Sequence, residues 1–224
     1  MDDIMIEKEF NFVFLGQSIL RYKMPKLLID EINSTYEKFV KKKKLLSMES
    51  KLAGKIRNEH SLFWNSEDES RMKRHNVLSK SILNFFKEKT IHYLKWNKIK
   101  KYRYKINSIW VNEMRAGEYN PVHDHSGDLP MGLSSVLILK VPKNYGKEYT
   151  RKDMPANGQL NFLGNNKGCF CKDGYQPKHL QVGDFFLFPY DVSHCVYPFK
   201  SKEKRRTLSA NIDVMYNPII ENKV

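Results

Sequence analysis

Histidines in the second half of the chain are its strongest candidates for chemistry. His123 and His125 are two residues apart within the segment Tyr119–Asp128. On a β-strand this spacing directs both side chains to one face. His194 opens a later run of strand-forming residues and is the candidate for a third ligand. Imidazole and carboxylate groups suit Fe(II), and three protein ligands on one face of the ion leave its other positions open for small molecules.

Two sets of ligands are compatible with this segment. In the first, His123, His125 and His194 form a three-histidine face. In the second, Asp128 supplies a carboxylate and one histidine moves away from the metal. Asp124 ranks last, because a regular strand would turn it to the face opposite His123. The residue types alone leave both sets open.

A stripe of polar residues follows His194 along the chain. Strand alternation puts its members on one face, and these are Arg205, Thr207, Ser209 and Asn211. A polar face directed into a protein interior is costly unless it meets a ligand or water. A guanidinium pairs bidentately with a carboxylate, so Arg205 is the predicted anchor for a carboxylate co-substrate, helped by Thr207 or Ser209. A register shifted by one residue would give this role to Arg206, and both arginines could instead simply end a basic surface run.

Two kinds of element must position these residues. Apolar residues at steps of three and four predict helices from Pro25 to about Lys44 and from about Val77 to Trp96. Residues 47–75 are polar and irregular, which is typical of a loop with a short helix or strand. After residue 105 the period changes to that of strands separated by glycine- and asparagine-rich turns. The predicted strands are Ile106–Met114, Ser134–Val141, Gln159–Leu163, His179–Val182, Phe185–Phe188, His194–Tyr197 and Arg205–Met215. We therefore expect a basic, mainly helical part (residues 1–105) packed on a β-core (residues 106–224) as one structural unit.

Charge and cysteine content narrow the class of protein. The net charge is +14, and residues 1–105 hold 24 Lys and Arg against 13 Asp and Glu. This bias could attract nucleic acid or an acidic partner, although a solvated surface is the simpler interpretation. Cys169, Cys171 and Cys195 are too few for a disulfide framework and predict free thiols. No apolar run is long enough to span a bilayer, and we expect a cytoplasmic protein.

Taken together, six segments resemble the 2-oxoglutarate/Fe(II)-dependent oxygenase superfamily, in particular its phage and bacterial prolyl-4-hydroxylase-like members. Their order and spacing fit over about residues 106–215, whereas residues 1–105 match only weakly. The segments are Ser108–Asn112, Tyr119–Asp128 leading into Leu133–Lys140, Gly158–Phe162, Val182–Pro189, His194–Phe199 and Arg205–Asn211. One departure is that Leu137 and Ile138 stand where such members often carry a tyrosine.

The resemblance implies a mainly β fold with flanking helices, built on a double-stranded β-helix (jelly-roll) core. It implies Fe(II) at His123, His125 and His194, and 2-oxoglutarate held by Arg205, with ascorbate as a candidate reductant. Asn112 and Asn211 are further candidate contacts. The implied function is a dioxygenase that hydroxylates a protein side chain. The alternatives are an oxygenase acting on a nucleobase or nucleotide, and a cupin-like metal or small-molecule binding protein without turnover.

Overall fold

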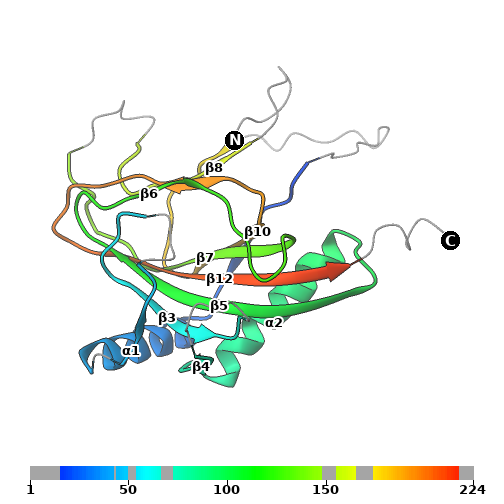
Figure 1. Ribbon diagram of the computed structural model, residues 1–224. Helices are drawn as coiled ribbons and strands as arrows, with labels where there is room; N and C mark the ends of the chain where they lie inside the picture. Colours follow the sequence, from blue (N-terminus) through cyan, green and yellow to red (C-terminus); the bar gives the residue numbers. More distant parts are fainter. Residues whose placement is uncertain are drawn as a thin grey trace, which may run out of the picture.

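Figure 1 shows stacked β-sheets with helices on one outer side. The computed structural model describes residues 16–42, 44–49, 54–66, 73–147, 155–164 and 174–216. Within these residues the larger sheet has the strand order β1-β10-β7-β12-β5-β3-β2, with β4 paired to β3. Its strands are β1 (Leu20–Lys23), β2 (Leu46–Ser47), β3 (Glu59–Trp64), β4 (His75–Asn76), β5 (Tyr102–Met114), β7 (Gly132–Lys140), β10 (Asp184–Pro189) and β12 (Arg205–Tyr216).

The smaller sheet has the order β6-β11-β8-β9. It is built from β6 (Asn120–His123), β8 (Leu160–Leu163), β9 (Gly174–Tyr175) and β11 (His194–Val196). All pairings in both sheets are antiparallel. Consecutive strands from β5 to β12 cross repeatedly between the sheets, which is the double-stranded β-helix predicted from the sequence.

Two helices, α1 (Lys26–Lys41) and α2 (Lys80–Trp96), cover the outer face of the larger sheet (Figure 1). Each buries one apolar stripe, as the helical spacing predicted: Ile29, Ile32 and Tyr36 from α1, and Ile82, Phe85, Phe86, Tyr93 and Leu94 from α2. Ser79 caps α2 by accepting a hydrogen bond from the Ile82 backbone N–H at 3.3 Å. The two helices therefore stiffen the sheet from behind.

A second apolar core lies between the two sheets. Alternate residues of the central strands supply it, because successive side chains on a strand point to opposite faces. Its buried members include Met114, Val136, Ile138, Phe162, Phe186, Phe188 and Val196. This core holds β6 and β11 against the larger sheet and so sets the distance between residues on the two sheets.

One predicted strand is absent, and two further strands form where no definite element was predicted. His179–Val182 is not a strand, because His179 adopts φ 52 and a turn precedes Gly183. Within the irregular stretch 47–75, Glu59–Trp64 forms β3 and joins the larger sheet beside β5. Leu20–Lys23 adds β1 at the far edge, although its four residues are too few for a recognisable period.

The helices in the described part of the chain are too short or too polar to cross a bilayer. Cys195 is a buried free thiol, as predicted. Cys169 and Cys171 lie outside the described residues.

Glu59 in β3 is a buried carboxyl group that should make stability depend on pH. It is 1% exposed, and neither carboxyl oxygen has a hydrogen-bond partner among the described residues. Burial, with the negative charges of Glu49 and Glu118, raises the pKa of Glu59 to about 8. The folded protein therefore holds this proton more tightly than the unfolded chain, and its contribution to stability is lost as pH rises from about 4.5 towards about 8.

We expect Glu59→Gln to remove this loss. When pH is raised from 5 to 8, the parent protein should lose on the order of 2 kcal/mol of unfolding free energy that the variant keeps. Urea unfolding at the two pH values measures the difference. Glu88→Gln on the exposed side of α2 is the matched control and should show no such gain. An equal response of both variants to pH would contradict the prediction.

Candidate metal and co-substrate site

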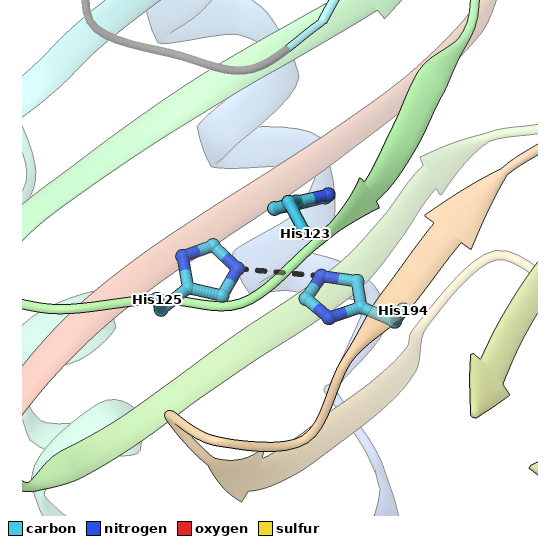
Figure 2. Close-up of side chains that lie close together, drawn as sticks. All are labelled: His123, His125 and His194. Carbon is cyan, nitrogen blue, oxygen red and sulfur yellow. Dashed lines mark hydrogen bonds between the residues drawn. The ribbon is translucent and has the colours of Figure 1, made fainter. Parts of the chain in front are cut away.

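Strand pairing brings the three histidines together. His123 ends β6, His194 begins β11, and the two are direct partners across the smaller sheet. His125 follows β6 by two residues, where its backbone N–H donates to the Tyr190 carbonyl at 2.9 Å. Figure 2 shows the three imidazoles facing one another, and ligand atoms from all three lie within 4.8 Å of each other. The Nε2 atoms of His125 and His194 are 3.3 Å apart.

Backbone carbonyls orient two of the three rings. Nδ1 of His123 lies 2.7 Å from the Pro121 carbonyl, and Nδ1 of His194 lies 3.0 Å from the Val192 carbonyl. A carbonyl only accepts, so Nδ1 carries the proton in each case and Nε2 keeps a free lone pair. In this tautomer Nε2 is available to bind a metal ion.

The surroundings of the cluster favour neutral imidazole. Burial lowers the pKa of His125 well below its usual value, and the charges of His194 and His123 lower it further. Burial and the neighbouring His123 lower the pKa of His194 to about 4. Neutral rings with converging lone pairs are a donor set suited to Fe(II), Zn(II) or another divalent transition metal. The residues present therefore fit a metal ion.

The histidines share one pocket with the polar stripe of β12. The pocket has a volume of about 170 Å³ and lies between the two sheets. Its lining includes every site residue that the sequence singled out: His123, His125, His194, Arg205, Thr207, Ser209, Asn112 and Asn211. The Asn112 side-chain amide lies 3.5 Å from the Ser209 hydroxyl, and that of Asn211 donates to the Ser126 carbonyl at 3.0 Å.

Arg205 is a buried cation without an acidic partner in the described residues. Its side chain is 1% exposed, and neither Nε nor Nη2 has a hydrogen-bond partner. Nη1 contacts the Met114 sulfur at 3.8 Å, and the Tyr145 phenol interacts with the guanidinium as a neutral partner. A buried charge without a counter-charge is strongly unfavourable, so the pocket is suited to receive an anion.

Arg206 points the opposite way and is fully engaged. Its guanidinium donates to Glu113 at 2.5 and 2.9 Å, and to Asn33 and Glu37 of α1. These contacts tie α1 to the back of the larger sheet. Of the two registers considered from the sequence, the structure has the one that turns Arg205 into the pocket.

The carboxylates near the histidines do not join their cluster. Asp128 is bonded to Lys105, whose Nζ lies 2.8 Å away, and to the Ser66 hydroxyl. Asp124 lines the pocket with an exposed side chain. Neither belongs to the group of potential ligand atoms formed by the three histidines.

Tyr145 was not identified from the sequence. It lies in the irregular segment after β7, and its ring packs against Phe199 at 5.7 Å between centroids. Burial raises the pKa of the Tyr145 phenol, while the adjacent Arg205 opposes this rise. No local pattern marks it, because its place beside Arg205 arises from the packing of a loop. It supplies a phenol near the guanidinium, whereas Leu137 and Ile138 contribute only to the apolar cores.

Comparisons with known proteins agree with this geometry. Residues 108–211 match the family described as "Putative 2OG-Fe(II) oxygenase". No curated protein matches the chain. The segment matched runs from β5 to β12 and so contains the three histidines and Arg205.

Solved structures with the same fold include three oxygenases of low sequence identity. A prolyl-4-hydroxylase from Pseudomonas putida is 14% identical with a TM-score of 0.54, covering 88% of this chain and 92% of its own. A prolyl hydroxylase from Trichoplax adhaerens, in complex with a peptide from hypoxia inducible factor, is 11% identical with a TM-score of 0.54, covering 88% and 84%. The carbocyclase SnoK, which is non-haem and α-ketoglutarate-dependent and comes from nogalamycin biosynthesis, is 12% identical with a TM-score of 0.57, covering 91% and 83%.

The family match and the histidine cluster on a double-stranded β-helix lead to one assignment. The metal of this protein is accordingly Fe(II), and its co-substrate is 2-oxoglutarate. Over residues 108–211 the chain carries the core of a 2-oxoglutarate/Fe(II)-dependent oxygenase.

Proposed function

We propose that this oxygenase hydroxylates a protein side chain, with proline as the first candidate. The observation that carries the proposal is the buried Arg205 facing the same pocket as three converging imidazoles. A metal-binding protein without turnover needs the histidines but has no use for a buried guanidinium that lacks an acidic partner among the described residues. This arrangement favours the oxygenase over the cupin-like binder.

Each residue has a separate task in the proposal. His123, His125 and His194 hold Fe(II) on one side and leave the other side open. Arg205 binds the far carboxylate of 2-oxoglutarate, with Tyr145 beside it and the buried hydroxyls of Thr207 and Ser209 as further donors. Bound together, Fe(II) and 2-oxoglutarate supply the O₂-dependent oxidation that ends in hydroxylation.

The remaining residues orient and enclose the co-substrate. Val136 and Val196 form apolar walls of the pocket, and the buried amide of Asn112 lies beside the Ser209 hydroxyl. Apolar walls limit access of water and strengthen the pairing of Arg205 with an anion. Arg206 contributes only indirectly, by fastening β12 to α1.

A protein substrate is supported by likeness rather than by geometry alone. Two of the structures with the same fold are prolyl hydroxylases, and one of them is in complex with a peptide. SnoK shows that the same fold also serves a reaction of another kind, so fold alone does not choose the substrate.

An anaerobic titration tests the proposal. Fe(II) and 2-oxoglutarate together should produce a visible charge-transfer band that neither gives alone. Admitting O₂ in the presence of ascorbate should then release succinate, even without substrate. Metal binding with neither a band nor succinate would support the non-catalytic binder instead.

The third metal ligand can be tested by a pair of substitutions. We expect His125→Ala to weaken Fe(II) binding by at least about a hundredfold, more than the loss of an outer hydrogen-bond partner of a metal ligand. Asp128→Asn should leave the affinity within a few fold, since its carboxylate is bonded to Lys105. Equilibrium dialysis with Fe(II) under argon measures both. The opposite ranking would assign the third position to Asp128.

A further inference from the structure

A second cavity adjoins the histidine pocket and has no role in the site described so far. It has a volume of about 310 Å³ and shares Trp110, Ser126 and Asn211 with that pocket. Its other lining residues are Met48, Trp64, Ser66, Asn107, Ser108, Gly127 and Asp128. Because the two cavities share Trp110, Ser126 and Asn211, the second one lies directly beside the histidine pocket. We call it the amide cleft.

A β-bulge gives the cleft its central side chain. Asn211 on β12 pairs with Ser108, whereas the next residue, Ile212, pairs with Ile106. Asn107 is therefore an extra residue in β5, and both Asn107 and Ser108 line the cleft instead of pointing to opposite faces. Bulges commonly redirect a side chain next to an active site.

Polar atoms in the cleft lack partners within the described chain. Asn107 is 1% exposed, and both its Oδ1 and Nδ2 are without a hydrogen bond. Trp110 is 2% exposed with an unpartnered Nε1, and Oδ1 of Asn211 is also unpartnered. Leaving such buried groups unsatisfied is costly, so a ligand with matching donors and acceptors is favoured here. Together these atoms offer donors and acceptors but no net charge.

Charge distinguishes the possible ligands. No Lys or Arg is among the described residues that line the cleft, and its single charged member, Asp128, is bonded to Lys105. The excess of positive charge in residues 1–105 therefore does not extend into this cleft. Nucleic acid relies mainly on phosphate contacts with Lys and Arg, which the lining does not provide. The neutral N–H and C=O groups of a peptide main chain can form hydrogen bonds with the side-chain amides of Asn107 and Asn211. Trp110 and Met48 add apolar walls.

We propose that the amide cleft binds the main chain of an extended, uncharged peptide segment, with Asn107 as its principal hydrogen-bonding residue. This inference rests on the proposed function. It adds which residues bind the substrate and which groups of the substrate they bind. The side chain to be oxidised lies at the histidine pocket. The adjacent peptide group lies between Asn107, Asn211 and Trp110. Specificity here comes from amide hydrogen bonds and a neutral, partly apolar surface.

The test uses capped pentapeptides with the sequence acetyl-Gly-Ala-Xaa-Ala-Gly-amide, where Xaa is Pro, Lys, Asn or Asp. Binding to protein loaded anaerobically with Fe(II) and 2-oxoglutarate is measured by calorimetry, and stimulated succinate release is measured in air. We expect at least one peptide to bind and stimulate, and Asn107→Leu to weaken its binding about tenfold through the loss of a donor and an acceptor. The effect should appear in KM more than in kcat.

Asn161→Leu is the matched control, because Asn161 lies on β8 outside the lining of the cleft. It should leave peptide binding unchanged. The inference is overturned if no peptide binds, if Asn107→Leu binds the peptides as well as the parent, or if an oligothymidylate binds in an Asn107-dependent way instead. In these cases an intact charge-transfer band shows that the oxygenase assignment stands. A missing band with no succinate overturns the proposed function as well.

Discussion

Replacing His194 by alanine should abolish stoichiometric Fe(II) binding. His194 is 3% exposed at the first position of β11, and its Nε2 lies 3.3 Å from Nε2 of His125. No carboxylate among the described residues joins the cluster to take its place. We expect the affinity for Fe(II) to fall by at least about a hundredfold, and the charge-transfer band to disappear with it.

The control for this experiment is His92→Ala. His92 is exposed on α2, bonds only to the Tyr22 hydroxyl, and lies on the far side of the larger sheet. Its replacement should leave Fe(II) stoichiometry at one per chain in equilibrium dialysis. Melting temperatures of both variants show that each is folded before binding is compared. Retention of one tightly bound Fe(II) by folded His194→Ala would exclude the three-histidine site.

Replacing Arg205 by alanine should raise the concentration of 2-oxoglutarate needed for half-saturation by about a hundredfold or more. Truncating one partner of a buried charge pair costs about 2–5 kcal/mol, and 1.4 kcal/mol corresponds to a factor of ten. Fe(II) affinity should change little, because no histidine in the cluster contacts the guanidinium. Titration of the charge-transfer band with 2-oxoglutarate measures the first quantity, and dialysis measures the second.

Arg206→Ala separates the two arginines. It breaks a buried pair with Glu113, so we expect a loss of about 3 kcal/mol in unfolding free energy. Co-substrate affinity should stay within a few fold of the parent protein, measured at a temperature where the variant is folded. If Arg206→Ala raised the 2-oxoglutarate requirement and Arg205→Ala did not, the anchor would have been assigned to the wrong arginine.

Local periodicity was sufficient for much of the fold. Runs of strand-forming residues bounded by turn signals predicted β5, β7, β10 and β12, and three- and four-residue steps predicted both helices, because each helix turns one face to a core. It failed for short elements: β1 and β9 have too few residues for a period, and the expected strand at His179 is interrupted by a left-handed backbone. β3 lies in a stretch where a short helix or strand was expected without a definite position, because polar residues flank it and its place in the sheet depends on pairing with β5.

For the site, the sequence by itself determined the candidates and their order along the chain: a close pair of histidines, a distant third, and a polar stripe headed by an arginine. Only the tertiary structure decided which of two neighbouring candidates takes each role in the site. Strand pairing put His125 rather than Asp128 beside the other imidazoles and turned Arg205 rather than Arg206 into the pocket. It also brought Tyr145 beside Arg205 and made the bulge that directs Asn107 into the amide cleft. The physical reason is that residue type and period are local properties, whereas facing and contact depend on register between strands far apart in the chain.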